Sequence, residues 1–268
     1  MTGSGEGVGA DMTQLVDRTI TALRAEHDVL VALLPNLPDE SFEAPSGASE
    51  WTVAQVLSHL GSGAEITRAP IARAAGEQLE PTDTHAVWAR WDAAGPLDQA
   101  AWFVEHNARW LETVEGLSAE QRASLQVDLG FLPDPVPLEV ALGMRLNEVA
   151  NHSWDVRVGL DPAAQVHPES AELFVELFRG PLGFILGFSA KPGELPEPAS
   201  VAVPGAGLVL DSGATVVARV ESPTATFHGT PEAFIRLLNG RLKDPYAGDV
   251  TVEGSVTLDD LRRVFPGY

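Results

Sequence analysis

Near the middle of the chain, ionisable side chains recur at intervals of three and four residues. They are Arg145, Glu148, His152 and Asp155. Residues at this spacing lie on one face of a helix, and the opposite face carries an apolar stripe. The stripe consists of Leu142, Leu146, Val149 and Val156. A helix that directs four ionisable groups the same way faces either water or a functional site.

Glu148 and His152 stand four residues apart, so a helix places one above the other on the same face. A carboxylate and an imidazole at this spacing can supply two ligands of one divalent metal ion, and the third ligand must then come from elsewhere. The alternative is a solvated face on which Glu148 pairs with Arg145. This segment alone leaves both interpretations open.

Three other segments also have the pattern of helices in a bundle. Residues 11–34 carry apolar side chains at steps of three and four. A second helix is expected after Thr52 and Gln55, which have the spacing of a capping box, and a third over 96–117. The glycine-rich residues 1–10 are expected to form a disordered tip.

The fourth helix, which carries the ionisable face, is expected over 138–158. Pro137 suits its first turn and Gly159 suits its C′ cap. Four such helices, joined by connections of varied length, pack most naturally as an antiparallel bundle. We therefore expect residues 11–161 to form a four-helix bundle.

Beyond Asp161 the pattern changes from helices alone to helices mixed with strands. Helices are expected over 169–178, 231–242 and 258–264, and strands over 208–210, 215–227 and 250–253. Residues 192–204 contain four prolines and indicate a passage rich in loops. Residues 162–268 should thus form a small α+β domain, which makes the whole chain α+β.

The charge balance and the lack of cysteine exclude several functions. The chain has 17 Lys and Arg against 38 Asp and Glu, a formal charge of −21, so nucleic acid and anionic membranes are poor partners. Without cysteine, disulfides and cysteine nucleophiles are excluded, and any thiol must arrive on a small molecule. The first ten residues lack the features of a signal peptide, and no apolar run is long enough to cross a bilayer. We expect a cytoplasmic protein.

His59 is the candidate for the third metal ligand. It lies at the margin of the apolar stripe of the second helix, and the nearby Gly61 and Gly63 leave room for a close approach. Because a bundle can place the second helix beside the fourth, His59 can converge with Glu148 and His152. Two imidazoles and one carboxylate leave coordination positions open on a metal ion, as catalytic sites require.

Two other histidines receive simpler interpretations. His27 lies on the apolar seam of the first helix and is expected to be a hydrogen-bonded core residue. His106 and Arg109, on the third helix, are expected to face solvent.

Two segments carry a resemblance to a known family. They are WTVAQVLSHL at 51–60 and NEVANHSWDV at 147–156. Paired in this order, they resemble the DinB-like superfamily and, more closely, the mycothiol-dependent maleylpyruvate isomerase family of actinobacteria. The resemblance implies zinc held in a four-helix bundle by His59, Glu148 and His152, although iron or nickel also suits these ligands. It also implies a C-terminal domain similar to sterol-carrier proteins.

The resemblance further implies how such a protein works. Mycothiol would bind the metal as a thiolate and add to a small electrophilic substrate, in an isomerase or an S-transferase. Asp155 would orient a metal ligand, with pairing to Arg157 or plain exposure as alternatives. Arg241 would clamp a substrate carboxylate, with Arg236 and Arg219 as competitors. The alternative is that the protein binds a metal or ligand without catalysing a reaction. We expect the protein to be a monomer or a homodimer.

Overall fold

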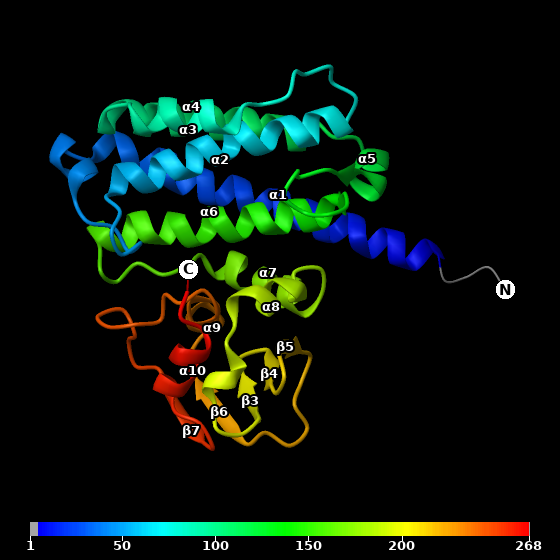
Figure 1. Cartoon of the computed structure of the whole chain (residues 1–268), viewed down its shortest axis with the longest axis vertical. Coiled ribbons are helices and arrows are strands. Elements are labelled where there is room, and N and C mark those ends of the chain that lie inside the picture. Colours follow the sequence, from blue (N-terminus) through cyan, green and yellow to red (C-terminus); the bar gives the residue numbers. More distant parts are fainter. Residues whose placement is uncertain (1–4, 268) are drawn as a thin grey trace. The chain divides into compact units, whose positions relative to one another are not determined.

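The chain folds into two compact units, and the boundary between them along the sequence lies between Ala164 and Gln165. The computed structural model describes residues 5–267 (Figure 1). The first unit is mainly helical, and the second combines a five-stranded sheet with helices. This arrangement confirms the predicted α+β class, with a helical bundle followed by a smaller domain that contains the sheet.

Four long helices build the N-terminal unit (Figure 1). They are α1 (Gly5–Leu33), α2 (Val53–Ala74), α4 (Pro96–Glu115) and α6 (Leu138–Leu160). Helix α2 packs against α4 and α6, and α1 packs against the same two helices, so the four form a closed bundle. The second and fourth of the predicted helices are therefore neighbours, as expected.

Shorter elements connect the long helices. They are η1 (Leu34–Asn36), η2 (Asp39–Glu43), α3 (Thr84–Asp92), α5 (Ala119–Ser124) and the strand pair β1 (Gln126–Val127) and β2 (Val136–Pro137). Helix α3 was not predicted from the sequence. Asp83 caps it by accepting a hydrogen bond from the backbone of Ala86, and the buried Val87 and Trp91 attach it to the bundle.

Two of the predicted boundaries in this unit differ from the structure. Helix α1 begins at Gly5, so residues 5–10 are helical, whereas residues 1–4 of the expected tip lie outside the described residues. Once a helix is nucleated, each added residue gains one backbone hydrogen bond, which extends it into poor helix formers. Gly159 lies inside α6 instead of capping it. A Cβ atom at Gly159 would lie 2.5 Å from the carbonyl oxygen of Pro45, so this glycine allows a loop to pack closely on the helix.

The C-terminal unit contains a five-stranded sheet in the order β5-β4-β3-β6-β7. The strands are β3 (Ala199–Val203), β4 (Ala206–Leu210), β5 (Ala214–Val217), β6 (Ala225–His228) and β7 (Thr251–Gly254). The pair β3–β6 is parallel, and the other pairs are antiparallel. The helical elements are α7 (Pro168–Arg179), η3 (Gly183–Ile185), α8 (Leu186–Ser189), η4 (Pro192–Glu194), α9 (Pro231–Leu238) and α10 (Leu258–Val264).

The sheet corrects two of the sequence-based predictions. Strand β3, at the centre of the sheet, falls within the proline-rich passage for which only loops were predicted. The single strand predicted over 215–227 is two strands, β5 and β6, on opposite sides of β3 and β4. Pro223 lies between them and has no backbone N–H to continue a ladder.

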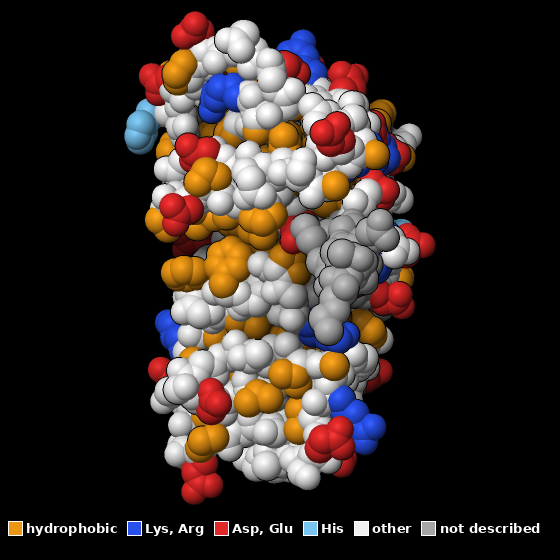
Figure 2. Space-filling model, turned by 90° about the vertical axis from the view of Figure 1, so that its right-hand side faces the viewer, with side chains coloured by type: hydrophobic (Ala, Val, Ile, Leu, Met, Phe, Trp, Pro, Cys, Tyr) orange, Lys and Arg blue, Asp and Glu red, His pale blue; other side chains and the backbone are white. Residues whose placement is uncertain are grey.

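The surface of both units carries many acidic side chains. Figure 2 shows them scattered among hydrophobic and uncharged groups over the face that it draws. None of the helices in residues 5–267 combines the length and the hydrophobicity needed to span a membrane.

Candidate metal centre

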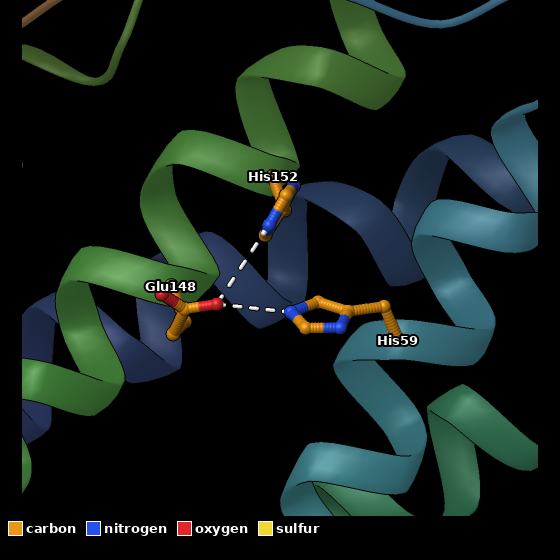
Figure 3. Close-up of side chains that lie close together, drawn as sticks. All are labelled: His59, Glu148 and His152. Atoms are coloured by element: carbon orange, nitrogen blue, oxygen red, sulfur yellow. Dashed lines mark hydrogen bonds and ion pairs between the residues drawn. The ribbon is translucent and has the colours of Figure 1, made fainter. Parts of the chain in front are cut away.

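Three side chains from two helices converge at the interface of α2 and α6. Figure 3 shows His59 on α2 pointing toward Glu148 and His152 on α6. The Oε2 atom of Glu148 lies 2.9 Å from Nε2 of His59 and 3.7 Å from Nε2 of His152. One potential ligand atom from each residue lies within 4.8 Å of the other two. The predicted convergence of these three residues is thus what the structure shows.

Local structure explains why the three side chains meet. The capping box predicted for Thr52 and Gln55 is present and starts α2 at Val53, which places His59 in its second turn. Glu148 and His152 lie one turn apart on α6, on the side that packs against α2. The side chains of His59 and Glu148 are 41% and 46% exposed, whereas that of His152 is 12% exposed. The cluster is therefore open to solvent on one side.

Glu148 is held in its ionised form. Burial by itself would raise its pKa, but the hydrogen bond from His59 and the charges of His152, His59 and Arg145 outweigh that effect. Together they lower the pKa of Glu148 to about 2. Because a carboxylate only accepts hydrogen bonds, Nε2 of His59 is the donor in the 2.9 Å contact. Glu148 thus presents a full negative charge to the open side of the cluster.

Asp155 contacts the second imidazole from behind. Its side chain is fully buried, and Oδ2 accepts a hydrogen bond of 2.8 Å from Nδ1 of His152. Nε2 of His152 is then the nitrogen that faces Glu148. A carboxylate bonded to the far nitrogen of a histidine is how metal-binding histidines are usually oriented. The burial of Asp155 excludes the alternative of an exposed residue. In addition, the backbone N–H of Gly47 donates to the backbone carbonyl oxygen of Asp155 at 2.8 Å.

Trp51 also contacts the cluster, although no role was predicted for it from the sequence. Its ring stacks on that of His152, with centroids 5.8 Å apart, and lies 5.1 Å from the ring of His59. Trp51 is 39% exposed, so it forms a wall that is partly open to solvent. Its position at the start of the WTVAQ segment was visible in the sequence, but a loop residue gives no periodic signal that shows which way it points.

The structure also places the remaining candidate residues of this unit. His27 is a buried, hydrogen-bonded core residue, as predicted, with Nδ1 2.9 Å from Nδ2 of Asn107. Arg109 is exposed, as predicted, and pairs with a neighbouring glutamate at 2.6 Å. The prediction for His106 was wrong, because its side chain is mostly buried, with Nδ1 3.4 Å from Glu65. The unpredicted helix α3 supplies Trp91, whose ring meets that of His106 edge to face, with centroids 5.4 Å apart.

The arginines proposed for substrate binding lie in the C-terminal unit. Arg241 is half-buried, and Nη1 donates to the carbonyl oxygen of Asn239 at 3.2 Å. Arg236 is buried and is bonded to Glu232 and to the carbonyl oxygen of Tyr246, which leaves it poorly suited to bind a substrate. Arg219 is largely exposed. The role of Arg241 in substrate binding stays a prediction.

The donor set fits a divalent metal ion. Ligand atoms around a tetrahedral zinc are about 3.3 Å apart, given bonds of about 2.0–2.1 Å. The separations of Glu148 Oε2 from the two Nε2 atoms, 2.9 and 3.7 Å, lie on either side of that value. The fold and the cluster define a class of protein. It is a four-helix bundle in which two histidines and a glutamate form a solvent-open cluster between two of the helices.

The comparisons with known proteins identify the family within this class. Residues 23–157, half of the chain, match the mycothiol maleylpyruvate isomerase N-terminal domain, and the chain belongs to this family. Crystal structures of the mycothiol-dependent maleylpyruvate isomerase and of a histidine-to-alanine mutant of it share the fold. Each aligns over 90% of this chain and 94% of its own, with a TM-score of 0.59 and a sequence identity of 18% and 17%, respectively.

Two relatives come from Mycobacterium tuberculosis. They are the uncharacterised proteins Rv0738 of strain H37Rv and MT0763 of strain CDC 1551. Each is 28% identical to this chain over 152 residues, which cover 57% of this chain and 72% of the relative.

Proposed function

We propose that this protein is a metal-dependent and mycothiol-dependent isomerase or S-transferase that acts on a small electrophilic substrate. The observation that supports the proposal is the convergence of His59, Glu148 and His152 at an open face of the bundle. Membership of the mycothiol maleylpyruvate isomerase family supports a thiol-dependent isomerase in particular. The lack of cysteine in the chain agrees with a thiol that is supplied by a cosubstrate.

In this proposal the three side chains hold a divalent metal ion, with zinc as the first choice and iron or nickel as alternatives. A bound metal ion would lower the pKa of a coordinated thiol, so that the reactive thiolate is present at neutral pH. The ionised Glu148 supplies one negative charge to the site. Two neutral imidazoles and one carboxylate leave one positive charge on a divalent ion, which favours binding of one thiolate.

Other residues of the chain would orient ligands and restrict access. Asp155 holds the imidazole of His152 so that Nε2 faces the metal position. The ring of Trp51 limits access of water to one side of the two imidazoles. Arg241 is proposed to bind a carboxylate of the substrate. A cytoplasmic location and a monomeric or dimeric state remain part of the proposal, which includes no nucleic acid or membrane partner.

The test is a turnover assay with maleylpyruvate and mycothiol, performed with and without the thiol. We expect the wild type to need both the thiol and a metal, and His152→Ala to lose at least about 100-fold in turnover. His85→Ala removes an exposed histidine of α3 outside the cluster and is expected to retain full activity. A wild type that binds metal but shows no thiol-dependent turnover of electrophiles would support the non-catalytic alternative.

Asp155→Asn is expected to weaken metal binding by about 10–100-fold, the usual effect of losing the outer partner of a metal-binding histidine. Asparagine keeps an oxygen near Nδ1 of His152 but removes the negative charge that stabilises its N–H. The measurement is a competition titration with a chelator of known affinity. Asp92→Asn changes an exposed aspartate of α3 and is the matched control. Equal affinity of the two variants would show that Asp155 does not act on the metal site.

A further inference from the structure

A hydrogen-bonded network of buried polar groups joins all four long helices directly beside the ligand cluster. Arg145 of α6 donates from Nη2 to the carbonyl oxygen of Leu60 on α2 at 2.8 Å and to Oδ1 of Asn107 on α4 at 2.9 Å. Nδ2 of Asn107 lies 2.9 Å from Nδ1 of His27 on α1. All three side chains are buried, with Arg145 only 6% exposed.

The chemistry of arginine fixes the direction of each hydrogen bond in this network. A guanidinium can only donate, so the oxygen of the Asn107 amide must face Arg145 and its NH₂ group must face His27. Nδ1 of His27 then accepts, and its proton is on Nε2. Burial also lowers the pKa of His27, with a smaller contribution from the charge of Arg24, which agrees with a neutral ring. This network of hydrogen bonds therefore has one consistent arrangement of donors and acceptors.

A buried arginine is costly, and a buried charge is in general weak evidence for a gain in stability. Burial lowers the pKa of Arg145 to about 10, although Glu148 opposes the shift, so the guanidinium remains charged at neutral pH. Its Cζ atom lies over the ring of Trp110, 5.7 Å from the ring centroid. Well-packed apolar side chains often replace buried ionic groups without loss of stability. A specific geometric role is a better explanation for a charge in this position.

The position of Arg145 indicates what that role is. Arg145 precedes Glu148 by one helical turn, and its acceptor Leu60 directly follows His59. One hydrogen bond thus crosses from α6 to α2 next to the 2.9 Å contact between His59 and Glu148. Gly63 permits this close approach, because a Cβ atom there would lie 3.0 Å from Nη1 of Arg145.

We propose that Arg145, held in place by Asn107 and His27, is a positioning residue that sets the separation of α2 and α6 at the ligand cluster. Its effect on the cluster is to fix the spacing of the potential ligand atoms of His59 and Glu148. The inference rests on the proposed function as far as the metal ion is concerned. The effect on spacing is a property of the protein itself and can be measured without a metal.

Arg145→Lys keeps the charge but cannot donate to both acceptors with the fixed geometry of a guanidinium. We expect its affinity for Co²⁺ to fall at least about 10-fold and the visible absorption spectrum of bound Co²⁺ to change. In its crystal structure, the separation of His59 Nε2 and Glu148 Oε2 is expected to shift by more than about 0.5 Å. Asn107→Ser, which is too short to reach Arg145, should produce smaller changes of the same kind and is a milder variant if the first folds poorly.

The matched control is Arg236→Lys. Arg236 is as deeply buried as Arg145 and also bonds to a carbonyl oxygen, but it lies in the other unit. It should lower the stability of its unit and leave the affinity and spectrum of Co²⁺ unchanged. An unchanged spacing of the ligand atoms in Arg145→Lys and Asn107→Ser would overturn the inference. A wild type that binds no Co²⁺ would overturn the proposed function, and the spacing would still decide the role of Arg145.

Discussion

His59→Ala is expected to weaken binding of a divalent metal by more than about 100-fold while the bundle stays folded. The reason is that His59 supplies the ligand atom from α2, and loss of a ligand should exceed the 10–100-fold effect of losing an outer partner. The side chain is 41% exposed, so its removal creates no buried cavity. The measurement is elemental analysis of the purified and dialysed variant beside the wild type, with circular dichroism to monitor the fold.

His85→Ala, which changes an exposed histidine of the same unit, should retain the metal content of the wild type. Stoichiometric metal in His59→Ala would mean that the metal binds elsewhere. That result would remove the basis for a site formed between α2 and α6.

Gly61→Ala is expected to destabilise the bundle strongly, because the added methyl group would have no space. A Cβ atom at Gly61 would lie 2.1 Å from Cη2 of Trp91 and 3.0 Å from Cα of Phe103. Trp91 is fully buried and Phe103 would have to move its backbone, so neither neighbour can give way easily. We expect the free energy of unfolding to fall by about 1–3 kcal/mol or more, which outweighs the gain of about 1 kcal/mol from removing a helical glycine.

Urea-induced unfolding of Gly61→Ala and wild type measures this difference. Gly187→Ala is the control, because Gly187 also lies in a helix and a Cβ atom there would meet no atom within 4 Å. The control should be as stable as the wild type or slightly more stable. Equal stability of Gly61→Ala and wild type would show that α2, α3 and α4 are less tightly packed at this point than the structure indicates.

The sequence was sufficient to predict the parts of the fold that depend on local signals. The capping box at Thr52 and Gln55 and the apolar spacing of the long helices are readable from neighbouring residues, and both are present. The spacing of Glu148 and His152 placed them on one helical face, and the expected neighbour relation of two helices added His59. Gly61 and Gly63 were predicted to allow a close approach. In the structure the ring of Trp91 lies against Gly61, and the guanidinium of Arg145 lies against Gly63.

What the sequence could not predict depends on contacts between distant residues. Asn107 and Arg145 stand 38 positions apart, and no local pattern shows that they share a hydrogen bond. Trp51 lies in a loop, so its direction is set by how the loop packs on α6 and not by a periodic pattern. Strand β3 is flanked by prolines, and its parallel pairing with β6 joins residues that are far apart in the chain. In each case tertiary packing decides the structure.

The measurement that tests the central claim most directly is an anomalous difference map from crystals of the purified wild-type protein, collected at the absorption edge of its metal. We predict one peak at the interface of α2 and α6, about 2.0–2.2 Å from Nε2 of His59, Nε2 of His152 and a carboxylate oxygen of Glu148. A map with no peak among these three side chains, from protein that is active with the thiol, would contradict the account.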